Sequence, residues 1–249
     1  MSKILELHDI NYSYHTPKAE TKALENINFQ ISLGSFTAIV GPSGCGKSTL
    51  LYIISGIIKP DSGLVTVCGN ANIGYMLQHD YLFEWRSVYR NILLGLEIQK
   101  RKSKSSLEYI DYLLERYGLK DFKYSRPSEL SGGMRQRVAL IRTLALNPDI
   151  LLLDEPFSAL DYQTRLTVCD DIASIIKDEK KTAIMVTHDL AEAISVADTV
   201  IVLSRRPGRI KSTMDISFPE SITRPMERRN SPKFNEYFNI LWKELDEQS

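Results

Sequence analysis

The chain has 249 residues, of which 43% are hydrophobic and 25% charged, as in ordinary folded proteins rather than disordered or fibrous ones. Its 31 Lys and Arg residues equal its 31 Asp and Glu residues, so no net positive charge favours a nucleic-acid partner. The apolar runs are far shorter than the roughly 20 residues that cross a bilayer, and no signal peptide is evident. We therefore expect one α/β domain over residues 1–249 that stays in the cytoplasm.

The N-terminal segments have the alternation of apolar and polar residues that is typical of strands. Residues 4–14 and 23–40 follow this period, with Ile27, Phe29 and Ile31 on one face. They predict an N-terminal antiparallel sheet. The polar segment 15–22 contains a proline and is predicted to be an exposed loop between the strands.

A glycine-rich segment follows the second of these stretches. It reads GPSGCGKST and matches the phosphate-binding pattern G-x-x-x-x-G-K-[ST] between a predicted strand and a predicted helix over residues 47–58. Glycines allow backbone amides to surround phosphate oxygens, and the helix points its positive end at the same anion. The predicted nucleotide contacts are Gly41, Pro42, Ser43, Gly44, Cys45, Gly46, Lys47, Ser48 and Thr49, with Ser48 also a predicted Mg²⁺ ligand.

The middle of the chain, roughly residues 80–140, is predicted to be helical. Apolar residues recur at spacings of three and four between 107 and 117, which indicates a helix with one buried face. Short apolar runs at 150–153, 183–186 and 200–203 then predict parallel strands joined by crossover helices. Residues 218–249 form a polar C-terminal extension that is predicted to end in an amphipathic helix. The three cysteines, Cys45, Cys68 and Cys169, are widely spaced and predicted to be free thiols.

Two further motifs carry chemistry. The strand at 150–153 ends in Asp154 and Glu155; one carboxylate can hold Mg²⁺ and the other can polarise the water that attacks a γ-phosphate. The segment 130–136, LSGGMRQ, opens a predicted helix with a serine and two glycines, a second set of groups suited to phosphate. A plain capped helix start is the alternative for this segment.

Together these motifs resemble the ATP-binding cassette (ABC) family over nearly all of residues 1–210. The resemblance implies a P-loop NTPase core with a parallel sheet, an N-terminal antiparallel β-subdomain and a helical signature subdomain. Residues 130–136 look like the family signature, with Met134 where glutamine is commonest. Ser131, Gly132 and Gly133 would then contact ATP held by a second copy of the chain, so that two copies share two sites.

The family resemblance also assigns single residues. Tyr14, with Tyr12 as the alternative, resembles the aromatic residue that stacks on adenine. Gln78 resembles the glutamine that contacts Mg²⁺ and the attacking water, Asp161 resembles the aspartate at the dimer seam, and His188 resembles the histidine that contacts the γ-phosphate. With Glu155, the residues Gln78 and His188 form the expected catalytic set, and the implied cofactors are ATP and Mg²⁺.

Two segments resemble a particular branch of the family. Residues 82–88 and 203–210 look like segments of importers for nitrate, sulfonate and taurine. This resemblance implies a cassette at the cytoplasmic face of the cell membrane, docked on transmembrane permease subunits. An extracytoplasmic solute-binding protein would deliver the solute to these subunits. Trp85 is expected either to dock on the permease or to pack in the core.

Three other functions compete with transport. The alternative within the family is a soluble ABC ATPase that is not coupled to transport; the neutral charge and the absence of a second cassette or a coiled-coil insertion argue against its nucleic-acid and ribosomal forms. A P-loop kinase would not need the signature, Asp161 or His188. A regulatory module that binds nucleotide without hydrolysis would not need Glu155.

Overall fold

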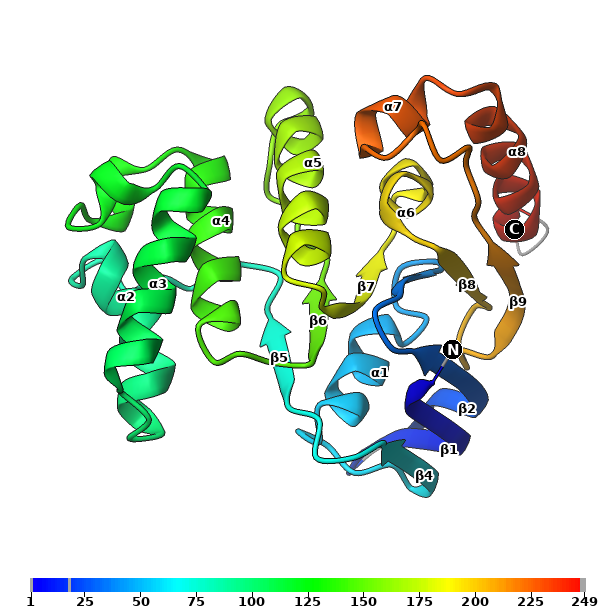
Figure 1. The fold of residues 1–249 in the computed structure, drawn as a ribbon. Coiled ribbons are helices and arrows are strands. Elements are labelled where there is room, and N and C mark those ends of the chain that lie inside the picture. The colour runs from blue at the N-terminus through cyan, green and yellow to red at the C-terminus, as the bar shows by residue number, and fades with distance from the viewer. Residues whose placement is uncertain (1, 18, 247–249) are drawn as a thin grey trace.

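A six-stranded sheet forms the centre of the computed structural model, which describes residues 2–17 and 19–246 (Figure 1). The strands lie in the order β5-β6-β7-β3-β8-β9, in which all neighbours are parallel except β8 and β9. Their bounds are β3 Phe36–Val40, β5 Ile73–Met76, β6 Ile150–Asp154, β7 Thr182–Thr187, β8 Thr199–Leu203 and β9 Ile210–Asp215. The predicted parallel sheet is confirmed.

Side chains on both faces of this sheet are buried. In β3, Ala38 and Val40 belong to the core beneath the helices, while Ile39 belongs to the core shared with the N-terminal sheet. In β6, Leu153 and Leu152 divide in the same way. Strands covered on both faces need continuous apolar runs, which explains why the strand at 150–153 has no polar residue before its end.

The N-terminal antiparallel sheet has the order β2-β1-β4, with β1 Lys3–Thr16, β2 Ala19–Ser32 and β4 Ser62–Val67. The loop predicted for 15–22 is wrong: β1 and β2 stay paired as far as Thr16 and Ala19. The connection is therefore a short turn around Pro17, with residue 18 outside the described residues. Helix α1, Lys47–Ile54, packs its leucines against this sheet and ends four residues before the predicted end at 58.

Three helices form a lobe at one side of the sheet, on the left of Figure 1: α2 Val88–Ile98, α3 Lys104–Arg116 and α4 Gly132–Leu144. Two 3-10 turns, Lys120–Phe122 and Pro127–Glu129, connect α3 to α4. The buried residues of α3 are Ile110, Leu113 and Leu114, all within the apolar pattern between 107 and 117. Helices α5 Tyr162–Asp178 and α6 Leu190–Val196 then follow β6 and β7.

The C-terminal segment folds back on the sheet. After β9, helices α7 Pro225–Arg229 and α8 Pro232–Asp246 pack beside α6, at the upper right of Figure 1. Phe234 and Leu241 bury the apolar face of α8, as its amphipathic pattern predicts. Residues 247–249 of the expected C-terminal extension 218–249 lie outside the described residues.

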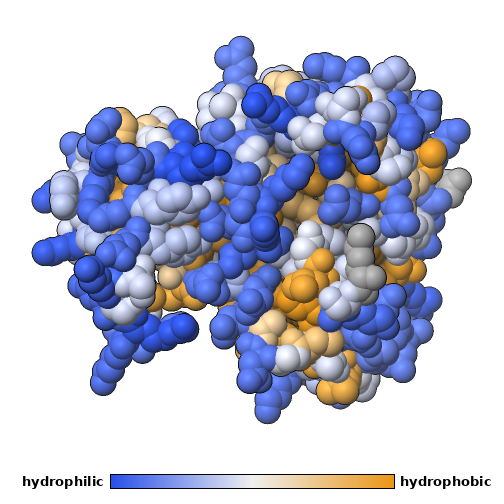
Figure 2. Space-filling view, in the orientation of Figure 1, coloured by the Kyte–Doolittle hydropathy of each residue, from blue (hydrophilic) through white to orange (hydrophobic). Residues whose placement is uncertain are grey.

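The surface is mainly hydrophilic on the face that Figure 2 shows. Hydrophobic side chains gather there at the lower right, over α1 and β4; exposed apolar residues of this region include Ile57 and Leu64. Within residues 2–17 and 19–246, none of the helices combines the length and the apolar character that a bilayer crossing requires.

Candidate active site

The sheet order brings the predicted site residues together. Strands β5, β6, β7 and β3 are consecutive parallel neighbours, so their carboxyl ends meet at one edge, where open α/β sheets bind ligands. Gln78 follows β5, Asp154 ends β6 with Glu155 directly after it, and His188 follows β7. The glycine-rich loop follows β3. Predicted site residues that lie as far apart in the sequence as positions 41 and 188 therefore meet at one edge of the sheet.

The glycine-rich loop has the backbone that a phosphate cradle requires. Gly44 and Gly46 have φ angles of +74° and +107°, a region that disfavours residues with a Cβ atom. Lys47 begins α1 and is buried; its Nζ donates to the carbonyl oxygens of Gly41 at 2.8 Å and Pro42 at 3.1 Å. The ammonium group thus lies inside the loop, where phosphate oxygens can replace these carbonyls as its partners.

Cys45 lies within the loop but faces the protein interior. Its side chain is buried in the core shared with the N-terminal sheet. Burial raises the pKa of the Cys45 thiol, although Lys47 nearby acts in the opposite direction, so the thiol stays protonated at neutral pH. All three cysteines are free, as predicted. Only the backbone of Cys45 is therefore suited to contact phosphate.

Of the two candidates for the adenine-stacking residue, Tyr14 has the better position. Its ring is exposed at the end of β1, and its hydroxyl lies 2.9 Å from Thr49 Oγ1 in α1. Tyr12 is more buried and meets Tyr14 edge to face, with ring centroids 5.0 Å apart. A base could therefore lie flat against Tyr14 beside the phosphate loop, whereas the ring of Tyr12 is partly covered.

The buried carboxylate of Asp154 accepts two hydrogen bonds. Ser48 Oγ donates to Oδ1 at 3.0 Å, and the Tyr75 hydroxyl donates to Oδ2 at 2.9 Å. Burial raises the pKa of Asp154 above its usual value, and the two hydrogen bonds oppose this rise. The Ser48 hydroxyl and the Asp154 carboxylate are neighbouring oxygen ligands of the hard type that Mg²⁺ prefers.

Glu155 lies at the centre of the expected catalytic set. Its φ angle of 43° is uncommon outside glycine, and such strain concentrates at functional sites. Its Oε2 lies 3.1 Å from His188 Nδ1 and 3.5 Å from Gln78 Nε2. Gln78 also approaches Ser158 Oγ at 3.4 Å. His188 and Gln78 thus converge on one carboxylate oxygen of Glu155.

The signature segment lies apart from the phosphate loop of its own chain. Ser131 caps α4 and accepts a hydrogen bond from the amide of Met134 at 3.3 Å. A Cβ atom at Gly132 would lie 3.1 Å from Leu160 Cδ2, and one at Gly133 would lie 2.8 Å from a Val168 methyl. The segment therefore packs on α5 and on the turn before it. Within the described ranges, no hydrogen bond joins residues 131–133 to residues 41–49.

Sequence reasoning missed three residues of the site. Tyr75 lies in β5, a strand that the sequence pattern did not predict, and nothing in that pattern showed that its hydroxyl reaches Asp154. Arg206 Nε donates to Gly44 O at 3.0 Å from a segment that had only marked a subfamily. Arg165 follows Asp161 by one helical turn and reaches the residue after His188. Of these three residues, only Arg165 could have been predicted from spacing, because it lies one helical turn after Asp161.

The fold, with its glycine-rich loop between β3 and α1, is that of a P-loop nucleotide hydrolase. The family model described as ABC transporter matches residues 24–158. The chain belongs to the ABC transporter family, as an ATP-binding subunit with ATPase activity.

Three curated relatives resemble this chain over nearly its whole length. An uncharacterized ABC transporter ATP-binding protein, YtlC of Bacillus subtilis, is 45% identical over 97% of this chain and 95% of its own length. The nitrate import ATP-binding protein NrtD of Synechocystis is 40% identical over 94% of this chain and 91% of its own. The taurine import ATP-binding protein TauB of Jannaschia is 36% identical over 96% and 94%. The expected resemblance to the nitrate and taurine importers is confirmed.

A solved structure shares the fold. The ATP-binding cassette MJ0796, in a dimeric post-hydrolysis state bound to ADP and Pi, aligns with a TM-score of 0.73 and 29% identity. The alignment covers 87% of this chain and all of that one. The α/β fold class with an N-terminal antiparallel sheet is therefore confirmed.

Proposed function

We propose that this chain powers the import of a small solute of the nitrate, sulfonate or taurine type. It works as a homodimer on the cytoplasmic face of the cell membrane, beneath separate permease subunits that receive solute from an extracytoplasmic binding protein. The observation that carries this proposal is the exposed Trp85 segment, which lies between Gln78 of the catalytic set and the helical lobe. The similarity to nitrate and taurine import subunits supports the substrate class.

In the proposed reaction, Glu155 accepts a proton from the water that attacks the γ-phosphate. His188 holds the γ-phosphate and Gln78 orients the water, so that nucleophile and leaving group lie in line. The Lys47 ammonium lies within reach of the same phosphates and stabilises their negative charge. Bound Mg²⁺ would neutralise further phosphate charge, held by Ser48 and Asp154 with Gln78 as a third ligand.

Closure of two copies completes the proposed site. Among the described residues, no hydrogen bond joins Ser131, Gly132 or Gly133 to the phosphate loop of their own chain, which leaves the amide-rich start of α4 available to ATP on a partner. Asp161 would lie at the seam. Binding of ATP then closes the dimer, and hydrolysis reopens it.

Motion reaches the permease through the segment that follows Gln78. Arg135, one turn after the signature glycines, binds Asp80 through Nε at 2.8 Å and Nη2 at 3.2 Å, and Glu84 at 3.1 Å. Burial is the largest influence and would raise the pKa of Asp80, but the hydrogen bonds from Arg135 and the Leu82 amide, together with the charges of Arg135 and Arg142, lower this pKa overall. This bidentate pair makes the signature helix and the Trp85 segment move together.

The import function is tested by identifying the permease that copurifies with this chain and expressing the two together. Membrane vesicles loaded with MgATP should take up labelled nitrate, an alkyl sulfonate or taurine, depending on the binding protein added, and should not do so with ADP. Hydrolysis of ATP that no permease and no solute stimulates would instead support the alternative, a soluble ABC ATPase not coupled to transport.

Because Trp85 is proposed to dock on the permease, its replacement should weaken assembly with the permease and leave the stability of the isolated chain unchanged. Trp85 is 73% exposed and contacts Phe83, with ring centroids 4.7 Å apart, so the alternative of core packing is wrong. Trp85→Ala should leave the melting temperature within about 2 °C, because little buried area is lost. Pull-down of the permease should weaken about tenfold or more, as for an aromatic residue at the centre of an interface.

Trp242→Ala on α8 is the matched control, since this tryptophan is 56% exposed and lies far along the chain from the proposed docking segment. It should keep normal permease binding. Normal binding by Trp85→Ala would show that Trp85 does not dock.

A further inference from the structure

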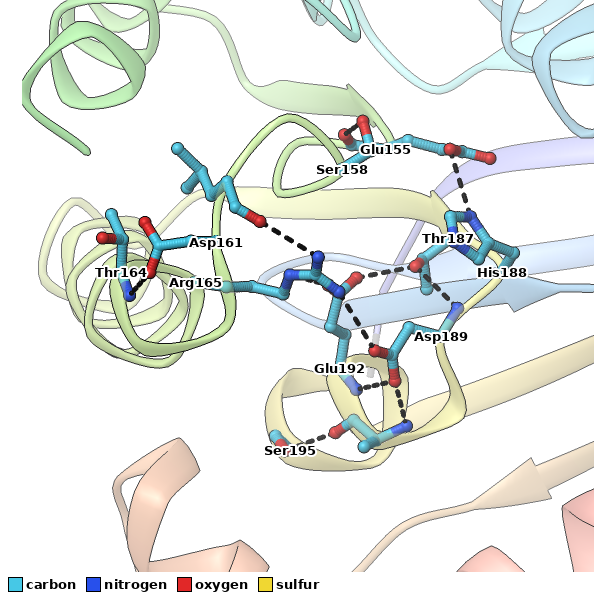
Figure 3. A network of polar contacts seen from close by, with 12 residues as sticks. Glu155, Ser158, Asp161, Thr164, Arg165, Thr187, His188, Asp189, Glu192 and Ser195 are labelled. Carbon is cyan, nitrogen blue, oxygen red and sulfur yellow. Dashed lines mark hydrogen bonds and ion pairs between the residues drawn. The ribbon is translucent and has the colours of Figure 1, made fainter. Parts of the chain in front are cut away.

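One arginine joins two parts of the site that serve different nucleotides in the proposed dimer. Arg165 lies at the end of the first turn of α5, the turn that Asp161 caps and that is called the α5 turn below. Its Nη2 donates to the carbonyl oxygen of Leu160 at 3.0 Å. In Figure 3 the guanidinium extends from this turn toward Asp189 and Glu192, at the start of α6. The side chain therefore spans from the α5 turn to the segment that carries His188.

The α6 end of this bridge is a tightly hydrogen-bonded unit. The Asp189 carboxylate caps α6, accepting from the amides of Ala191 at 2.7 Å and Glu192 at 3.2 Å. Thr187 Oγ1 donates to Glu192 Oε2 at 2.7 Å and accepts from the Asp189 amide at 3.0 Å. His188 lies between Thr187 and Asp189, so its backbone moves with this unit.

Arg165 forms ion pairs with this unit, but its guanidinium lies too far from the two carboxylates for hydrogen bonds. Its Nη1 lies 3.6 Å from Asp189 Oδ2 and its Nε lies 3.8 Å from Glu192 Oε1. Nε is buried and makes no hydrogen bond within residues 2–17 and 19–246, an arrangement that costs free energy. Glu192 is buried as well, and burial raises its pKa to about 7. A shift of about 1 Å between α5 and α6 would therefore form one or two charge-assisted hydrogen bonds.

The other end of the bridge touches the signature segment. The Leu160 side chain packs against Gly132, and Thr164 and Val168 of α5 pack against Gly133. These glycines would contact the partner's nucleotide, whereas His188, beside Glu155, would contact the nucleotide of its own chain. The path Gly132, Leu160, Arg165, Asp189, His188 is contiguous, and it runs from one proposed nucleotide site to the other.

We propose that Arg165 is a positioning residue that transmits closure at the signature segment to His188, and thereby couples the two nucleotide sites of the dimer. The proposal rests on the shared-site homodimer proposed above. When a partner's ATP draws the signature segment and the α5 turn inward, the guanidinium moves toward Asp189 and Glu192. It then holds His188 in its γ-phosphate position.

Arg165→Met tests this role because it keeps the aliphatic stem and removes the guanidinium. ATP turnover, measured against ATP concentration, should show kcat lowered about 10- to 100-fold, the cost of a misplaced catalytic group, with KM within about twofold of the wild type. The Hill coefficient should fall to unity from a wild-type value above it. ATP-dependent dimerisation in sedimentation experiments, in a Glu155→Gln background that prevents hydrolysis, should persist.

Three further variants make the result specific. Arg165→Lys keeps the charge and should recover part of the turnover. Glu192→Gln keeps the size of the side chain; it should also lower the Hill coefficient, and combined with Arg165→Met it should cost no more turnover than Arg165→Met alone. Arg116→Met is the control, because Arg116 forms an exposed ion pair with Asp178 at the far end of α5. It should behave as the wild type.

Wild-type kcat and Hill coefficient in Arg165→Met, or a wild-type Hill coefficient of unity, would overturn the coupling role. Should Arg165→Met fail to fold, an unchanged Hill coefficient in Glu192→Gln would overturn it equally. A wild-type chain that hydrolyses ATP only as a monomer would instead contradict the proposed homodimer, a result that sedimentation of the wild type separates from failure of Arg165.

Discussion

Glu155→Gln should lower ATP turnover at least about 100-fold, the low end of the contribution of a general base. The amide cannot accept the proton of the attacking water, but it keeps the size and the hydrogen bonds of the side chain that faces His188 and Gln78. Binding of ATP should survive, because the phosphate loop is unchanged. The variant should therefore accumulate as an ATP-bound dimer, which turnover assays and sedimentation velocity in MgATP measure.

Glu236→Gln provides the control for this variant. Glu236 lies on the exposed face of α8, and its replacement should leave turnover and sedimentation unchanged. Undiminished hydrolysis by Glu155→Gln would remove Glu155 from the mechanism. Lost hydrolysis together with lost ATP binding would indicate a damaged site rather than a missing base.

Lys47→Met should reduce ATP affinity about 10- to 100-fold. The buried ammonium group is held inside the loop by two carbonyl oxygens, and charge-assisted hydrogen bonds to phosphate contribute about 1.5–3 kcal/mol, at about 1.4 kcal/mol for each factor of ten. Methionine fills the space of the lysine stem without its charge. Equilibrium binding of a fluorescent ATP analogue, with and without competing ATP, measures the change.

Lys59→Met is a matched substitution outside the loop, since Lys59 is an exposed residue after α1. It should bind ATP as the wild type does. If Lys47→Met unfolds at a much lower temperature, the loss of affinity would reflect folding. Normal affinity in a folded Lys47→Met variant would show that Lys47 does not bind phosphate.

Local patterns were sufficient for much of the fold. The parallel strands at 150–153, 183–186 and 200–203 could be predicted because strands covered on both faces need unbroken apolar runs. The amphipathic patterns of α3 and α8 likewise predicted buried faces. The prediction failed at segment 15–22, where β1 and β2 continue to Thr16 and Ala19. Polar residues in an exposed hairpin carry no apolar alternation, so their pairing was not visible in the sequence.

The chain sequence by itself determined the phosphate loop, the acidic pair and the signature segment, because each is a contiguous run whose spacing carries its chemistry. Only the tertiary structure decided how these runs meet. The strand order β5-β6-β7-β3 places Gln78, Glu155 and His188 at one edge, and no local pattern encodes the order of strands. The Tyr75 to Asp154 hydrogen bond joins residues 79 positions apart, and the ion pair of Arg165 with Asp189 joins residues 24 positions apart. Such contacts arise from packing of the whole chain, which neighbouring residues do not specify.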